Sequence, residues 1–261
     1  MQLPFAVIPY PFTVMSAGNE RANRPASHLA EFKSRGMVWQ SNGNTSLQLR
    51  LDLGSSRPIN FLGMLCANAL SGTSLSITLS NNSDFSSPLH NSGAVSFVSP
   101  LITREDGVYH SHYEIGSVIT ARYVAIDIAG HTGDFQAAFL VIGQKLTPAS
   151  YYSPDFEFGL DDKGSIDWTR YGVAEEESGV IMRKLGLTFS WLSQSDYETK
   201  FRPMTEKLGK RGMVYFCFDP TPDTTRQAKT YFGVLTDPPF ATGAAPKQTN
   251  YEMKMELLSL I

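Results

Sequence analysis

The stretch Leu47–Gly54 reads LQLRLDLG, and a second stretch, Ala121–Gly130, reads ARYVAIDIAG. In both stretches apolar and polar residues alternate with a period of two, which is the pattern of a β-strand with one buried face. SLSITLS repeats this alternation, and FQAAFLVIG is apolar over most of its length. Clusters of Gly, Asn, Ser and Pro separate these runs and favour turns. Many short strands without a convincing long helix predict a β-sandwich or jelly roll.

The composition of the 261 residues is that of a globular protein, with 42% hydrophobic and 18% charged residues. The formal net charge of −3, without a basic stripe, argues against a nucleic-acid partner, because phosphate binding needs clustered Lys and Arg. No run approaches the ~20 apolar residues of a membrane span, and we expect no signal peptide. Cys66 and Cys217 lie in apolar contexts, so we interpret them as buried free thiols made in a reducing compartment.

A domain boundary is expected near Pro148, within QKLTPASYYSPDF, where prolines and small polar residues resemble a linker. All five His residues precede this point, and most long charged side chains follow it. We therefore expect a sandwich domain over residues 1–148, in which residues 1–20 form an N-terminal arm. A second β domain is expected over residues 149–261.

The second half carries further strand patterns. GMVYFCFDP, YFGVL and YEMKMELLSL are expected strands, and in the last Met253, Met255 and Leu257 share a face. In LGLTFSWL the alternation places the side chains of Leu185, Leu187, Phe189 and Trp191 on one face.

One amphipathic helix is expected near residues 195–208. Ser195 and Glu198 have the spacing of a capping box, and Gly209 is a plausible stop. Pro203 predicts that the helix kinks or divides. The residues with helical spacing are Tyr197, Phe201, Met204 and Leu208.

The order of motifs in the first half resembles the discoidin domain, the C-type domain of coagulation factors V and VIII. The residues that carry the resemblance are Trp39, Asp52, Leu53, Gly54, Ser80, Arg122 and Tyr123. The resemblance implies a sandwich that binds ligands through loops at one end. Extracellular members usually tie their ends with a disulfide, and no cysteines stand there in this chain.

The second half, with GLDDKGSIDWTRYGV and GKRGMVYFCFDPTPD, resembles the tail-tube-like domain of distal tail and related tail-tip proteins of long-tailed bacteriophages. This resemblance implies a structural protein of the tail tip or baseplate that forms a three- or six-fold homo-oligomeric ring. Other tail proteins would be its partners, and the protein would lie in the virion after assembly in the host cytoplasm. The sandwich domain would bind either neighbouring tail proteins or host-surface glycans.

Candidate ligand-binding residues gather in SNGN and in the VYHSHYEIG region. They are Asn42, Asn44, Arg104, Tyr109, His110, His112 and Tyr113. Aromatic faces pack on apolar faces of sugars, and Arg donates to hydroxyls or carboxylates. A metal at the histidine pair is the weaker alternative, because no third ligand is evident beyond Glu114. Trp39 is expected in the core rather than at a ligand.

No catalytic motif is present: G-x-S-x-G, a P-loop, G-x-G-x-x-G and zinc signatures are all missing. We therefore expect neither enzyme activity nor a cofactor or metal. Two alternatives remain to the tail-tip interpretation, namely a stand-alone carbohydrate-binding protein of the discoidin class and a glycosidase with an appended binding module. A glycosidase needs two carboxylates roughly 5–10 Å apart in a cleft.

Charged residues predict a contact between subunits of the ring. AEEESG is expected to be a solvated or interface loop, and Glu175, Glu176 and Glu177 within it could face the basic stretch containing Lys210 and Arg211 of a neighbouring subunit. Charge complementarity of this kind sets register more than affinity.

Overall fold

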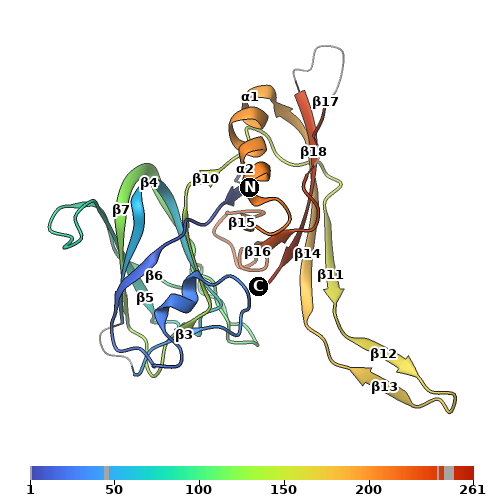
Figure 1. Ribbon diagram of the computed structural model, residues 1–261, viewed down its shortest axis with the longest axis horizontal. Coiled ribbons are helices and arrows are strands. Elements are labelled where there is room, and N and C mark those ends of the chain that lie inside the picture. Colours follow the sequence, from blue (N-terminus) through green and yellow to red (C-terminus); the bar gives the residue numbers. More distant parts are fainter. Residues whose placement is uncertain (1, 44–46, 240, 244–249) are drawn as a thin grey trace. The chain divides into compact units, whose positions relative to one another are not determined.

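The computed structural model describes residues 2–43, 47–239, 241–243 and 250–261. Its elements are mostly β-strands, and the main helical segment spans residues 194–208 (Figure 1). The predicted fold class, mostly β with one inserted helix, is therefore confirmed. Among the described residues, no helix is long and apolar enough to cross a membrane.

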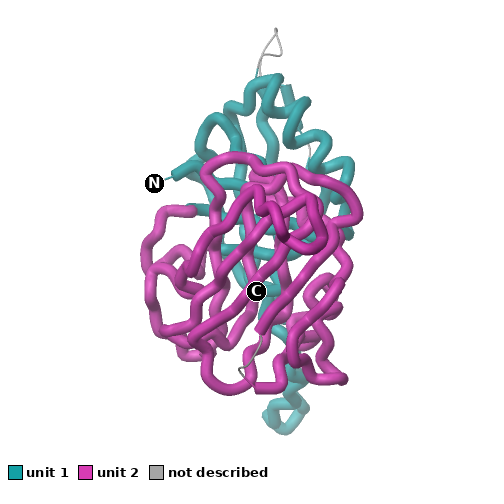
Figure 2. The backbone as a smooth tube through the Cα atoms, turned by 90° about the vertical axis from the view of Figure 1, so that its left-hand side faces the viewer, with its two compact units in different colours: residues 1–5, 146–219, 230–261 teal, residues 6–145, 220–229 magenta. Residues whose placement is uncertain are grey.

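The chain divides into two compact units, which Figure 2 colours separately. Unit 1 comprises residues 1–5, 146–219 and 230–261, and unit 2 comprises residues 6–145 and 220–229. The short strands β1 (Phe5–Val7) and β10 (Lys145–Leu146) contain two of the points where the chain passes between the units. The single boundary expected near residue 148 misses the return of residues 220–229 to unit 2.

Unit 1 is built on an antiparallel sheet with the strand order β15-β16-β18-β14-β11, and β17 pairs with β18. Met253, Met255 and Leu257 of β18 are buried, as their alternation predicts. The strands of this sheet are β11 (Glu157–Asp162), β14 (Ile181–Ser193), β15 (Met213–Cys217), β16 (Thr230–Leu235), β17 (Ala241–Gly243) and β18 (Asn250–Ser259).

A β-bulge interrupts β14. Leu185, Leu187 and Phe189 are buried as predicted, but Trp191 is 69% exposed and Leu192 is buried. The pairing of β14 with β18 shifts register between Phe189 and Leu192. Because one extra residue reverses the face to which the following side chains point, the bulge turns Trp191 to solvent. The prediction that Trp191 shares the buried face is wrong.

The helical segment begins at Ser193 rather than at Ser195. Ser193 is the N-cap, and its hydroxyl accepts a hydrogen bond from the Asp196 N–H at 3.1 Å. The expected capping box of Ser195 and Glu198 is therefore wrong, because the first turn has already closed two residues earlier.

The helix divides, as Pro203 predicts. A π-helical turn separates two α-helical pieces, and Pro203 lies in the first turn of the second piece, where its missing N–H interrupts the hydrogen-bond ladder. The expected stop at Gly209 is also observed, since Gly209 is the C-cap with φ of 50°. The three pieces are α1 (Gln194–Asp196), η2 (Tyr197–Phe201) and α2 (Arg202–Leu208).

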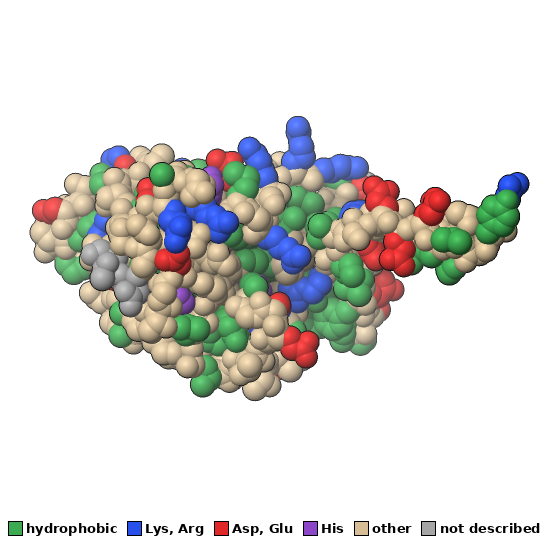
Figure 3. Space-filling model, turned by 90° about the horizontal axis from the view of Figure 1, so that it is seen from below, with side chains coloured by type: hydrophobic (Ala, Val, Ile, Leu, Met, Phe, Trp, Pro, Cys, Tyr) green, Lys and Arg blue, Asp and Glu red, His purple; other side chains and the backbone are tan. Residues whose placement is uncertain are grey.

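A separate two-stranded hairpin belongs to unit 1 and is called the arm below. It consists of β12 (Ser165–Trp168) and β13 (Ala174–Glu177), all of whose residues are exposed. Figure 3 shows acidic side chains along it. AEEESG is solvated as expected, but Ala174–Glu177 form a strand and not a loop. The pairing with SIDW supplies this strand, because AEEE itself has no alternation.

Unit 2 is a β-sandwich in which the two opening stretches are neighbours. They form β4 and β7, which pair antiparallel with Leu49 opposite Ile126 and Leu51 opposite Val124. The strand order is β2-β4-β7-β5-β6, with β9 on β4, and β3 pairs with β8. The elements are β2 (Thr13–Ala17), the 3₁₀-helix η1 (Ala26–Ala30), β3 (Trp39–Gln40), β4 (Gln48–Leu65), β5 (Ser74–Ser80), β6 (Pro88–Ser96), β7 (Tyr113–Ala129), β8 (Gln136–Ala137) and β9 (Phe139–Gly143). Residues 1–20 therefore contribute the strands β1 and β2, and they do not form the separate N-terminal segment that was expected.

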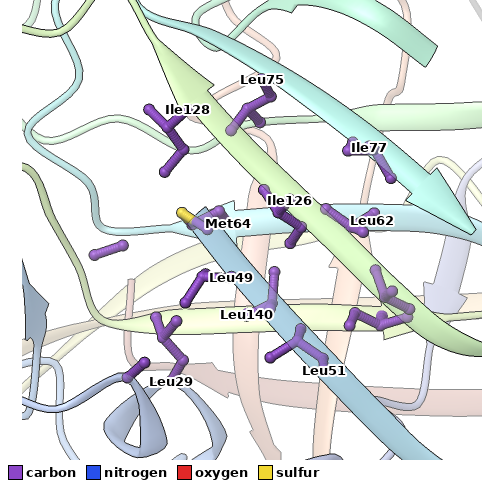
Figure 4. Close-up of a cluster of buried hydrophobic side chains, with 14 of the residues drawn as sticks. Leu29, Leu49, Leu51, Leu62, Met64, Leu75, Ile77, Ile126, Ile128 and Leu140 are labelled. Atoms are coloured by element: carbon purple, nitrogen blue, oxygen red, sulfur yellow. The ribbon is translucent and has the colours of Figure 1, made fainter. Parts of the chain in front are cut away.

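Both halves of β4 face one core (Figure 4). Leu49 and Leu51 come from the half that pairs with β2, whereas Leu62 and Met64 come from the half that pairs with β9. All four are fully buried, as are Ile126 and the predicted core residue Trp39. Burial of apolar surface stabilises a fold by roughly 25 cal/mol per Å². Because both halves of β4 bury side chains in the same core, this one strand ties the β2 side of the sandwich to the β9 side.

An ion pair joins β4 to β7 through two residues of the discoidin-like motifs. The Arg122 guanidinium donates to both Asp52 carboxylate oxygens at 2.8 Å. The hydrogen bonds from Arg122 lower the pKa of Asp52 below its usual value, despite an opposing effect of burial. The two motifs that contain Asp52 and Arg122 thus lie on neighbouring strands and are joined by a bidentate ion pair.

Candidate binding site at the loop end of unit 2

The loops of unit 2 gather where several strands begin or end together. Gln48 pairs with Asp127, and Ser74 pairs with Ala129. The loops before β4, after β7 and before β5 therefore share one end of the sandwich, which we call the loop end.

Asp134 holds these loops together. Its Oδ1 accepts a hydrogen bond from the Gly43 N–H at 2.7 Å, and its Oδ2 accepts from Arg21 Nε and Gln40 Nε2 at 3.1 Å each. Its backbone carbonyl accepts from Asn68 Nδ2 at 2.8 Å. The Gly43 N–H, followed by Arg21, lowers the pKa of Asp134 below its usual value. The carboxylate is therefore charged at neutral pH and holds Arg21 and residues 40–43, while the carbonyl of the same residue holds Asn68.

A pocket of 240 Å³ opens between residues 68–71 and residues 98–109. Its walls are largely apolar. Leu70 and Leu101 are 44% and 63% exposed, and the half-buried Tyr109 ring adds an aromatic surface. Pockets that bind small polar ligands typically combine such walls with a few placed polar groups.

Hydroxyl groups supply the polar part of this pocket. Ser71, Thr103 and Tyr109 line it, and the Tyr109 hydroxyl accepts from the Arg104 N–H at 3.2 Å. Asn68 also lines it, but both ends of its amide are engaged, with Asp134 and with the Gln136 N–H at 2.9 Å. The hydroxyls can donate and accept, whereas Asn68 fixes the wall.

Arg104 orders the loop rather than pointing a free guanidinium at the pocket. Its Nε and Nη2 donate to the two oxygens of Asp106 at 3.1 and 2.8 Å, and Asp106 also accepts from the Val108 N–H at 3.0 Å. The Arg104 hydrogen bonds lower the pKa of Asp106, outweighing burial. The loop that carries Tyr109 is thereby held in one conformation.

His110 and Tyr113 are engaged within the fold. His110 is 6% exposed, and its ring Nδ1 accepts from the backbone N–H of Cys66 at 3.1 Å. The backbone N–H of His110 donates to Gln227 Oε1 at 3.0 Å. The Tyr113 hydroxyl and His90 Nε2 lie 2.9 Å apart. Ligand binding by these two side chains stays a prediction, and the structure gives each a structural role.

His112 belongs to a polar triad with Glu114 and Lys145, whose side chains are partly exposed. Its side chain is 6% exposed, its Nε2 lies 2.7 Å from Glu114 Oε1, and Lys145 Nζ donates to the other oxygen. Burial lowers the pKa of His112, so the ring is neutral at pH 7. Burial alone would raise the pKa of Glu114, but hydrogen bonds from His112 and Lys145 bring it to about 2. His112 thus faces Glu114 rather than the pocket.

Asn42 lies at the loop end, is exposed, and donates its N–H to the Asn19 carbonyl at 2.6 Å. Asn44 lies outside the described residues. Within the described part of the chain, no group of three or more His, Cys, Asp or Glu side chains could hold a metal ion.

Comparisons with known proteins add fold similarities over about half of the chain. No family model matches, and no curated protein matches. A family 32 carbohydrate-binding module from a family 31 glycoside hydrolase of Clostridium perfringens is 12% identical, with a TM-score of 0.43, and the match covers 52% of this chain and 96% of that one. The family 32 module of C. perfringens NanJ, in complex with galactose, is 19% identical (TM-score 0.42, 54% and 99% covered). A Streptococcus pneumoniae fucose binding module is 12% identical (TM-score 0.38, 51% and 89% covered).

The residues expected at a subunit interface all lie in unit 1. Glu175, Glu176 and Glu177 are exposed on β13, and Arg211 is exposed beyond α2. Lys210 pairs with Asp237 at 2.9 Å, and both side chains remain mostly exposed. Their role in an interface stays a prediction.

Sequence reasoning found Tyr109 but missed Asp134 and the walls Leu70 and Leu101. Asp134 follows a Gly in HTGDF, which reads as an ordinary turn. The two leucines come from loops about 30 residues apart, and only the strand pairing brings them together. No local pattern marks such a contact.

Proposed function

We propose that unit 2 binds carbohydrate in the loop-end pocket. The observation that carries this proposal is the pocket itself, a small hollow with an apolar and aromatic wall and three hydroxyls on loops that Asp134 and Asp106 hold in place. Sugar rings present apolar C–H faces and hydroxyl edges, which such a wall and rim complement. The resemblance to discoidin domains supports the same ligand class. The function is binding, not catalysis.

The proposal is tested by titrating the full chain with galactose and with fucose in a calorimeter, after a glycan array has ranked the ligands. Ser71→Trp places an indole in the pocket from an exposed position, and binding should fall by about ten-fold or more, which is about 1.4 kcal/mol. Ser83→Trp is the matched control, because Ser83 is exposed in the turn after β5, at the opposite end of that strand.

An empty glycan array and flat titrations would overturn the proposal. Binding that Ser71→Trp leaves intact would also overturn it, because the ligand would then occupy another surface.

A second candidate function is a structural role in the tail tip of a long-tailed bacteriophage. The observation that favours it is the exposed arm of unit 1, because a monomer gains nothing from an extended hairpin whose strands are exposed on both faces. The resemblance of the second half to tail-tip proteins supports this role, with host-surface glycans as ligands of unit 2. Mass spectrometry of purified particles, followed by gold labelling with antibody, tests it. Particles that lack the chain would exclude the role.

A further inference from the structure

The loop-end pocket is polar but uncharged. Among the described residues that line it, none is Asp, Glu, Lys, Arg or His, and its polar groups are the hydroxyls, the Asn68 amide and the backbone. An ionised ligand group that enters such a pocket loses its water without gaining a counter-charge, which costs far more than the same loss at a hydroxyl. The pocket is therefore matched to the hydroxyl groups of a neutral ligand.

The pocket is also small. Its volume of 240 Å³ lies below the roughly 300–1,000 Å³ of pockets that hold drug-sized ligands. We therefore expect it to hold a single sugar ring, so that a charged group on that ring lies in the pocket or at its rim. The charges at the rim then decide whether an acidic sugar binds.

One part of the rim is the loop from Thr103 to Gly107. Thr103 and Gly107 line the pocket, and Arg104, Glu105 and Asp106 lie between them in the chain. Glu105 and Asp106 are both exposed. With two negative charges and one positive charge, this part of the rim is negative overall, and it repels an anionic ligand.

Arg104 is a cation at this rim, and Asp106 already occupies it. Its Nε and Nη2 donate to the two carboxylate oxygens at 3.1 and 2.8 Å, which is the bidentate geometry in which Arg also binds the carboxylate of a ligand. These hydrogen bonds raise the pKa of Arg104, and the electrostatic interaction with Tyr109 adds to the rise. The guanidinium therefore lies near Tyr109, which lines the pocket, but its partner is a carboxylate of the protein.

The backbone of this loop holds Asp106 in place independently of the guanidinium. Asp106 Oδ1 also accepts from the Val108 N–H at 3.0 Å, and the Tyr109 hydroxyl accepts from the Arg104 N–H at 3.2 Å. An Asn at position 106 keeps an oxygen for the Val108 N–H and loses only the charge. The charge of Asp106 can therefore be removed while the loop keeps its backbone hydrogen bonds.

We propose that the loop-end pocket selects neutral sugars over acidic ones, and that Asp106 sets this selectivity by occupying the Arg104 guanidinium. Asp106 is a positioning residue, because it acts through Arg104. The inference rests on the proposed sugar binding and adds to it the class of sugar and the residue that determines the class.

A glycan array that carries neutral glycans beside their sialylated, sulfated and uronate-containing counterparts tests the selectivity of the full chain. Calorimetry then compares galactose with galacturonate and glucose with glucuronate, because the members of each pair differ only at C6. The neutral member should bind at least about ten-fold more tightly. Acidic glycans that bind as well as their neutral counterparts would overturn the inference and leave sugar binding in place. An empty array would instead overturn sugar binding itself.

Two variants test the role of Asp106. Asp106→Asn frees the guanidinium for a charge-assisted hydrogen bond to the ligand, so the preference for neutral sugars should fall by about ten-fold or more. Arg104→Gln in the same chain should restore the preference, because no guanidinium then remains at this position.

Asp84→Asn is the matched control. Asp84 is also exposed and accepts a backbone N–H two residues along the chain, from Ser86 at 3.0 Å, but it lies in the turn after β5, at the opposite end of that strand from the pocket. It should leave the preference unchanged. Equal loss of affinity for all glycans in Asp106→Asn would overturn the role of Asp106, and so would a gain for acidic glycans that persists without Arg104.

Discussion

Glu114 has a different role in the structure from the one that its position in the sequence implies. HSHYE places two His and one Glu at alternate positions, which resembles part of a metal site or a ligand edge. In the structure His112 and Lys145 hold Glu114 as a partly buried anion, and His110 is engaged with the backbone of Cys66. The structural role of these three side chains depends on how deeply the segment around them is buried, and the alternation of residues in the sequence does not predict the burial of a loop.

The Glu114 triad gives a pH-dependent stability of known sign. The pKa of Glu114 is about 2 in the fold against an ordinary 4.5, so its contribution is fully present above pH 4.5 and is lost as pH falls toward 2. Glu114→Gln should lower the free energy of unfolding by about 1–2 kcal/mol at pH 7, discounted for partial exposure, and by almost nothing near pH 2. Urea unfolding at several pH values measures this difference. Exposed Glu105→Gln is the control, and a constant difference across this range would contradict the assignment.

At the scale of elements, alternation located most buried faces and failed where hydrogen bonding departs from the regular ladder. The burial of the core leucines of β4 could be predicted from the sequence, because the pleat of a strand fixes a period of two. The exposure of Trp191 could not be predicted, because the bulge adds one residue to the strand and the composition gives no sign of it. The arm was read as a loop because both of its faces are exposed, so burial imposes no alternation on it. The loop-end pocket depends on contacts between distant loops, and only its Tyr109 was anticipated.

The bulge in β14 predicts opposite outcomes for two adjacent residues. Leu192→Ala should lower the free energy of unfolding by about 2–5 kcal/mol, because Leu192 is 1% exposed. Trp191→Ala should change it by about 0.5 kcal/mol or less, because Trp191 is mostly exposed. Urea denaturation curves of the two variants measure both values. Equal losses of unfolding free energy in the two variants would mean that Trp191 is buried, which would contradict the bulge in β14.

The helix start predicts a similar contrast between two serines. Ser193→Ala removes the hydroxyl that caps the Asp196 N–H and should cost about 1 kcal/mol. Ser195→Ala should be neutral or slightly stabilising, because Ser195 is exposed inside the helix, where Ala is the better helix former. Thermal unfolding followed by circular dichroism compares the two. A larger loss at Ser195 would restore the capping box.

At the scale of the whole molecule, the units are not two consecutive halves of the chain. Residues 220–229 belong to unit 2, where Arg226 donates to the Ser99 carbonyl and Gln227 Oε1 accepts the His110 N–H at 3.0 Å. The prolines and aspartates of FDPTPD are typical of a rigid turn, but this composition does not indicate which unit the turn contacts. The folding of unit 2 therefore depends on residues 220–229, which lie in sequence between two segments of unit 1, residues 146–219 and 230–261.

This dependence predicts that a change in the returning segment weakens unit 2 selectively. Gln227→Ala leaves the buried His110 N–H without its acceptor, which should cost about 1–3 kcal/mol. Hydrogen exchange should then quicken at the amides of β4 and β7 while the amides of β14 and β18 keep their rates, because the lost bond lies within unit 2. Thr224→Ala is the control in the same segment, since Thr224 is exposed and its loss should leave both sets unchanged. Equal acceleration in both units would mean that they unfold as one cooperative body, and unchanged β4 and β7 would mean that residues 220–229 do not support the sandwich.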